Sequence, residues 1–164
     1  MLRRAALRCT ALLFIACAFS PPPGRAAGAD AETGIARVRS AYSMQDTIAR
    51  IKQDVEAKGI KFFAEIDQAK LAHDAGIELR PSTLLIFGNP PLGAQFLTSN
   101  PDAGLDWPVR LLVFENEKGE VLTAYTDFGW IAHRHHIEDR QAAFSSATEV
   151  IASITATVQA RSPR

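Results

Sequence analysis

Three of the four histidines in this chain lie within four residues, downstream of an aspartate, and they are the side chains best suited to chemistry. If His133 and His136 lie on a helical turn, they share one face, so both imidazoles can reach one Zn²⁺ or Cu²⁺ ion. Asp127 is then a third ligand or a hydrogen-bond acceptor for a liganding ring. The spacing lacks the four-residue separation of a zinc-protease helix. In the structural alternative, His135 packs inside and its two neighbours face solvent.

A second interpretation of the same region is a small polar ligand site. Tyr125, Asp127 and His135 are close in sequence, and Arg80 and Asn89 stand on either side of an apolar run. There, His135 would serve as a general acid or base and Arg80 would bind an anion. Both flanking residues also have ordinary explanations, since Arg80 can pair with a carboxylate and Asn89 can cap a helix. No nucleophile with its own base is recognisable, so catalysis stays open.

Four aromatic residues suggest another kind of site. Trp107, Trp130, Phe128 and Phe96 can line an apolar ligand cleft or a subunit face, or they can be ordinary core residues. The sequence does not decide among these three roles.

Residues 1–29 have the pattern of a secretory signal peptide. A basic start precedes an apolar run too short to span a bilayer, then a proline-rich breaker and an Ala-x-Ala cleavage site before Asp30. No later stretch is long and apolar enough to span. We therefore expect a periplasmic or secreted protein with no transmembrane helix after processing. The alternative is a lipoprotein anchored through Cys17, because Phe14-Ile15-Ala16-Cys17 loosely resembles a lipidation signal.

The composition narrows the classes of partner. The 18 basic and 18 acidic residues balance, but four arginines lie in the predicted signal peptide, so 14 basic residues remain and the mature net charge is −4. This argues against nucleic acid as a partner. Both cysteines also lie in the predicted signal peptide, which leaves the mature domain without a disulfide or thiolate nucleophile. No cofactor is implied other than the Zn²⁺ or Cu²⁺ ion considered for the histidines.

Residues 30–164 predict a single α+β domain. Strand and helix patterns alternate, and one pair of strands flanks a four-residue turn typical of an antiparallel hairpin. We expect a mostly antiparallel sheet of about five strands, with helices packed mainly on one face and a long C-terminal helix over about 139–160. The run Thr83–Phe87 is apolar throughout, which predicts a central strand covered on both faces. The predicted strands are 35–42, 60–66, 83–87, 109–115 and 120–126; the shorter helices are 43–59, 67–73 and 92–99, and 128–135 is a turn or a short helix.

Several short strings give this chain a family resemblance over about residues 38–136. The chain resembles domain-of-unknown-function family 302 (DUF302), and it looks like an exported bacterial member. The resemblance implies a compact α+β fold and a homodimer, and it implies no established activity. Two positions depart from the usual family pattern, with Gln68 in place of a histidine and Ala94 in place of a threonine. The strings are Ile66-Asp67, Leu79-Arg80-Pro81-Ser82-Thr83, Ile86-Phe87-Gly88-Asn89-Pro90, Leu105-Asp106-Trp107-Pro108, Tyr125 and Arg134-His135.

Together these observations predict an exported small domain that binds a small ligand or assembles with a second copy of itself. An enzyme using His135 and a periplasmic metal binder using His133, His136 and Asp127 are the alternatives.

Overall fold

The computed structural model describes residues 29–160, so the predicted signal peptide and Cys17 lie outside the described residues, apart from Ala29. Within this range the chain alternates five strands with six helical segments. In chain order these are β1 (Ile35–Arg39), α1 (Met44–Ala57), β2 (Lys61–Asp67), α2 (Gln68–Asp74), β3 (Ser82–Gly88), α3 (Pro90–Ser99), the 3₁₀ helix η1 (Pro101–Leu105), β4 (Val109–Glu115), β5 (Val121–Thr126), α4 (Phe128–Arg134) and α5 (Gln141–Ala156).

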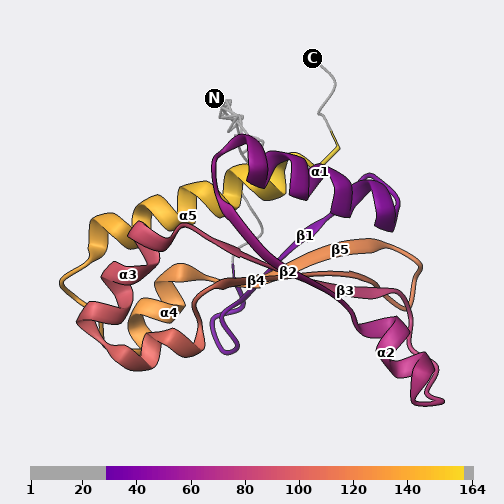
Figure 1. Cartoon of the computed structure of the whole chain (residues 1–164), viewed down its shortest axis with the longest axis horizontal. Coiled ribbons are helices and arrows are strands. Elements are labelled where there is room, and N and C mark those ends of the chain that lie inside the picture. Colours follow the sequence, from indigo (N-terminus) through magenta and orange to yellow (C-terminus); the bar gives the residue numbers. More distant parts are fainter. Residues whose placement is uncertain (1–28, 161–164) are drawn as a thin grey trace, which may run out of the picture.

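The five strands form one antiparallel sheet in the order β1-β5-β4-β3-β2. The longest helices, α1 and α5, lie together on one face of it (Figure 1). The α+β prediction is therefore confirmed, including the helices packed mainly on one face. Among residues 29–160, no helix is long and apolar enough to cross a membrane.

Short-range hydrogen bonds explain where four of the helices begin. The side chains of Ser43, Asp67, Asn89 and Asp127 each accept a hydrogen bond from a backbone N–H three residues ahead, at the starts of α1, α2, α3 and α4. Such caps satisfy N–H groups that have no partner inside the helix. All four side chains and their targets are local in sequence, which is why these helix starts are predictable.

The covered face of the sheet carries the core. Leu85 and Leu111 are cross-strand partners with no exposed surface, and Ile151 and Ile154 of α5 are buried with them. Phe96 of α3 stacks on Phe144 of α5, with ring centroids 4.2 Å apart. These contacts attach α3 and α5 to the sheet, and burying several large apolar side chains supplies most of the driving force for folding.

Three details differ from the sequence-based predictions. The central strand is β4, and β3 lies next to an edge strand, with Leu84 and Ile86 only partly buried on the side away from α1 and α5. The all-apolar run predicted that both faces of this strand are covered. In the described part of the chain, helices cover only one of its two faces. Helix α5 begins at Gln141 and ends at Ala156, inside the expected 139–160. The 3₁₀ helix η1 was not predicted.

Candidate functional site

The predicted site residues lie at two opposite ends of the sheet. Asn89 follows the last residue of β3, whereas Arg80 precedes its first residue, so the length of a seven-residue strand separates them. Asp127 and His135 flank α4, which is gathered with α3 and η1 at the end of the sheet where β3 finishes (Figure 1). The predicted convergence of Arg80 with Asn89, Asp127 and His135 is therefore not present. Arg80 is exposed at the other end.

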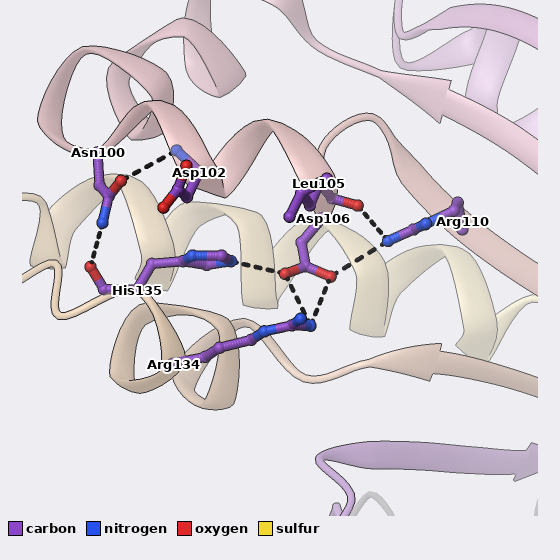
Figure 2. A network of polar contacts seen from close by, with 7 residues as sticks. All are labelled: Asn100, Asp102, Leu105, Asp106, Arg110, Arg134 and His135. Carbon is purple, nitrogen blue, oxygen red and sulfur yellow. Dashed lines mark hydrogen bonds and ion pairs between the residues drawn. The ribbon is translucent and has the colours of Figure 1, made fainter.

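A buried contact between a histidine and an aspartate forms the centre of the helix-bearing end. The imidazole Nε2 of His135 lies 2.7 Å from Oδ2 of Asp106, and the two side chains are only 6% and 4% exposed (Figure 2). An ionised carboxylate can only accept, so a proton on Nε2 makes this a charge-assisted hydrogen bond. Leaving either member of such a buried pair alone would be costly, and each therefore holds the other in position.

Two arginines contact the same carboxylate. Arg110 Nη2 lies 3.1 Å from Asp106 Oδ1, and Arg134 Nη1 lies 3.3 Å from Oδ2 and 3.5 Å from Oδ1 (Figure 2). Both arginine side chains are about half exposed, in contrast to Asp106 and His135. The carboxylate is thus enclosed by three donor side chains, two of which reach solvent.

His135 also fixes the 3₁₀ helix at both ends. Asn100 caps η1 by accepting from the backbone N–H of Asp102, and its amide Nδ2 donates to the carbonyl oxygen of His135 over 2.8 Å. Asp106, which receives the His135 ring, is the C-terminal cap of the same helix. Main chain and side chain of one histidine therefore hold the start and the end of η1 against the end of α4.

The other predicted site residues have separate partners. Asp127 caps α4 by accepting from Trp130 N–H over 2.9 Å, and Asn89 caps α3 by accepting from Leu92 N–H over 3.2 Å. Tyr125 lies on the covered face of β5, and burial raises the pKa of its phenol, with the nearby Asp127 carboxylate adding to the rise and a hydrogen bond with Thr155 opposing it. The hydrogen-bond partners of these three side chains are thus Trp130, Leu92 and Thr155, and not Asp106 or His135.

His133 and His136 are exposed residues at the end of α4. His136 has a positive φ of 52°, so it lies beyond the helical turn on which a shared metal-binding face was predicted. Among residues 29–160, no group of three or more His, Cys, Asp or Glu side chains is arranged to hold a metal ion. The geometry therefore offers these two histidines no third protein ligand within the described range.

An apolar cavity of about 330 Å³ lies on the covered side of the sheet. Three of the four aromatic residues proposed for an apolar cleft line it, while Trp130 does not. Lys58 and Asn89 contribute the polar part of its lining. The cavity is bounded by Ile60, Phe87, Gly88, Leu92, Phe96, Trp107, Val109, Phe128, Ala147, Val150, Ile151 and Ile154 as well.

Trp107 connects the cavity to the Asp106–His135 contact, because it directly follows Asp106 and its indole forms one wall. The indole lies against two glycines: a Cβ added at Gly93 would come within 2.0 Å of the ring, and one at Gly88 within 3.1 Å. The peptide bond between Trp107 and Pro108 is cis. Gly93 is therefore needed for close approach, which gives the glycine after the Phe-Gly-Asn-Pro string a packing role.

Comparison with known protein families assigns this chain to one family. The model of the family "Domain of unknown function DUF302" matches residues 36–160. The chain belongs to the DUF302 family. A crystal structure of an uncharacterized conserved DUF302 protein from Bacillus stearothermophilus superposes with a TM-score of 0.70 at 16% identity, covering 77% of this chain and 98% of that one. The shared fold is thus clear despite the low identity.

Longer proteins are also similar to this DUF302 chain. It is 32% identical over 126 residues to proteins named "Fluoride-specific ion channel FluC 1" in Brucella suis and in Brucella abortus, with 77% of this chain aligned. A protein named "Fluoride-specific ion channel FluC 2" in Brucella melitensis matches equally well. The match covers 48% of the first and 45% of the other two, so the chain spans about half the length of these relatives.

Sequence reasoning about this DUF302 chain missed Asp106 as a site residue. Asp106 was used only as part of the Leu-Asp-Trp-Pro string, and its partner His135 is 29 residues away. A signal was present, because an aspartate between a leucine and a tryptophan in a proline-flanked segment has large apolar neighbours that favour burial, and a buried carboxylate needs a partner. Gln68, which departs from the family pattern, lies in α2 and accepts from the Ser82 hydroxyl over 2.8 Å, outside this cluster.

Proposed function

We propose that this DUF302 domain binds an apolar or amphipathic small molecule in the cavity between α3, α5 and the covered face of the sheet. The observation that carries this proposal is the cavity itself, because about 330 Å³ lies at the lower end of small-molecule sites and its lining is largely aliphatic and aromatic. Known ligand sites combine such walls with a few polar groups that orient the ligand. Lys58 and Asn89 are available for that task.

The polar lining limits the ligand's chemistry. Lys58 Nζ already donates to Asp54 Oδ2 over 2.5 Å, so its positive charge is neutralised within the protein. Asn89 Oδ1 is engaged as the cap of α3. A ligand with a large apolar body and an uncharged polar group therefore fits better than an anion, since the only cation among the described residues of the cavity lining is already paired and cannot stabilise a negative charge.

The test uses the tryptophan in the wall of the cavity. Trp107 lines the cavity and Trp130 does not, so a Trp130→Phe protein reports from Trp107 alone. Titration with the neutral dye N-phenyl-1-naphthylamine should quench Trp107 emission saturably, with energy transfer to the dye. The anionic analogue anilinonaphthalene sulfonate should bind more weakly, because the cavity offers no unpaired cation.

A cavity-filling variant provides the matched control. Val150→Phe adds a ring inside the cavity and should abolish saturable dye binding, whereas Ser146→Phe adds the same ring at an exposed position of α5 and should leave it intact. Equal dye binding by both variants would contradict the proposal, as would wild-type quenching that stays linear in dye concentration.

Assembly is a second candidate function, because no helix layer formed by residues 29–160 covers one face of the sheet. Side chains on the face away from α1 and α5 are largely apolar and partly buried. Helix α2 and the segment after it extend from the β2 edge as an arm, with Leu71, Ile77 and Leu79 at least half exposed (Figure 1). The apolar residues of this open face are Leu84, Ile86, Leu112, Phe114, Leu122 and Ala124, and by register Arg37, Arg39 and Arg110 lie on the same face.

The size of the open face favours a second copy of the chain as the partner. Five strands of about six residues span roughly 24 by 20 Å, or about 500 Å². Two such faces would bury about 1,000 Å², the lower limit for a specific interface, before the arms are counted. In a pair related by a two-fold axis parallel to the strands, the β2 edge and the arm of each copy would lie over the β1 edge of the other and add to the buried area.

Light scattering after size exclusion tests this homodimer. At micromolar concentration the wild type should have twice the monomer mass, and Leu112→Lys on the open face should be a folded monomer. Thr98→Lys, at an exposed position of α3, is the matched control and should remain dimeric. A monomeric wild type would remove the proposal.

We also propose that the mature domain is exported, from the signal-peptide pattern of residues 1–29. Intact-mass analysis of protein from the native host or a bacterial host distinguishes the two processing routes. A chain beginning at Asp30 supports cleavage by signal peptidase, a lipidated chain beginning at Cys17 supports the lipoprotein alternative, and a chain that keeps Met1–Arg4 in the cytoplasm contradicts both.

An acid–base role for His135 has less support than ligand binding. Its ring is almost fully buried and its Nε2 is engaged by Asp106, so only Nδ1 is left to exchange a proton with a substrate.

A further inference from the structure

We propose that Arg110 and Arg134 form a binding site for a tetrahedral dianionic oxyanion, as free phosphate or as a phosphate monoester, at the solvent side of the buried Asp106–His135 pair. The proposal does not depend on the apolar cavity, because neither arginine lines it.

The charge balance of the cluster is the first support. One carboxylate, that of Asp106, is in contact with two guanidinium groups, and arginine stays protonated at any physiological pH. Among residues 29–160, no acidic side chain other than Asp106 lies within the 4.0 Å ion-pair distance of either guanidinium. The cluster therefore keeps at least one positive charge that the described part of the protein does not neutralise.

The spacing of the two guanidinium groups is the second support. Arg110 Nη2 and Arg134 Nη1 lie 3.1 and 3.5 Å from the same atom, Asp106 Oδ1, which keeps these nitrogens within about 7 Å of each other. Two oxygens of one tetrahedral anion can each accept from one guanidinium across such a gap. Arginine suits this role because its planar group presents several N–H donors in a fixed fork.

Both arginines are held in place before any ligand arrives. Arg110 Nη2 donates to the carbonyl oxygen of Leu105 as well as to Asp106. Arg134 is anchored by Asp106 and has its guanidinium carbon 5.5 Å from the centre of the Trp130 ring. Because each side chain is already restrained at two points, an anion loses less of its binding free energy to ordering them.

Accessibility completes the site. The side chains of Arg110 and Arg134 are 49% and 46% exposed, so an anion reaches them from solvent without opening the fold. Only one nitrogen of each guanidinium is used by Asp106, and the remaining N–H groups are available to a second acceptor. The buried carboxylate then holds the two guanidinium groups in place, and the incoming anion neutralises the surplus positive charge of the cluster.

Isothermal calorimetry at constant ionic strength tests the inference, with inorganic phosphate, glycerol phosphate, sulfate and chloride as probes. The wild-type domain should bind phosphate saturably and chloride not at all. In Arg134→Lys and Arg110→Lys the affinity should fall about tenfold, because lysine keeps the charge but loses the fork. Tighter binding of glycerol phosphate would identify a monoester as the ligand, and tighter binding of inorganic phosphate would identify the free ion.

Arg50→Lys is the matched control, since Arg50 is an exposed arginine of α1 outside the cluster, and it should bind phosphate as the wild type does. Should a lysine variant fail to fold by circular dichroism, Arg134→Gln serves in its place and should lose saturable binding. Phosphate binding that is absent from the wild type, or that is equal in the wild type and a folded Arg134 variant, would overturn the proposal.

Discussion

The two ends of the sheet are built from the same strands but are held together differently. At the end where β3 finishes, η1, α3 and α4 interlock through the Asp106–His135 pair and through Trp107 on Gly93. At the other end, α2 and its following segment carry exposed apolar side chains and the exposed ion pair of Lys70 with Asp74. A charged pair or a leucine is therefore expected to contribute differently to the free energy of unfolding at the two ends, because that contribution depends on burial.

Two aspartates give the largest expected contrast between the ends. Asp106→Ala should lower the free energy of unfolding by about 3 kcal/mol or more, because His135 is left buried without its partner and the end of η1 is released. Asp74→Ala removes an exposed pair and should cost less than about 0.5 kcal/mol. Urea denaturation of both variants measures the difference, and similar losses would remove the distinction between the two ends.

Two glycines of the helix-bearing end compare a tightly packed position with a loosely packed one. Gly93→Ala should lower the free energy of unfolding by about 2 kcal/mol, since its Cβ would overlap the Trp107 ring and the core must shift. Gly104→Ala in η1 should stay within about 0.5 kcal/mol of wild type, because its nearest side-chain atom is 3.9 Å away. The Trp107 emission maximum should change in Gly93→Ala only. An unchanged stability there would show that the tight indole contact is not required.

A smaller effect should appear at high pH. Burial, with help from Asp127, raises the pKa of Tyr125 above its ordinary value of 10.0, so the folded protein holds the phenol proton more tightly than the unfolded chain does. This contribution is intact below pH 10 and is lost as the pH rises through the folded-state pKa. Stability should therefore fall above pH 10, and less steeply in Tyr125→Phe.

Ultraviolet titration in a Tyr42→Phe background assigns the ionisation, because Tyr125 is then the only phenol left. If Tyr125 ionised at or below pH 10 there, the predicted pH dependence would be wrong.

The smallest effect on folding is expected in the arm. Leu79→Ser removes a side chain that is half exposed, so the free energy of unfolding of the monomer should change by less than about 0.5 kcal/mol. If the proposed homodimer forms, the same substitution should weaken the dimer, since the arm would contact the second copy. Unfolding of the monomer by urea, beside sedimentation equilibrium, separates the two effects. A large loss in the monomer would place Leu79 in the core of a single chain.

Most of the fold was predictable, and the polar centre of the site was not. Ser43, Asp67, Asn89 and Asp127 act on backbone groups three residues away, so their roles were visible in short strings. The hairpin of β4 and β5 was visible for the same reason. The Asp106–His135 pair joins residues from different elements, and neither residue's neighbours indicate the other. Arg80 was placed in a pocket with Asn89 because both flank β3, although a strand separates its two ends in space.

The sequence by itself determined the strands, the helices with their caps, the α+β class and the resemblance to DUF302, because alternation, capping and turn formation depend on near neighbours. Tertiary structure alone decided which polar residues lose contact with water and which partners they then require. It brought His135 against both ends of η1, placed Asp106 between two arginines, and left the cavity beside Trp107. Burial is a property of the whole packed chain, and it turns an ordinary aspartate into the centre of a site.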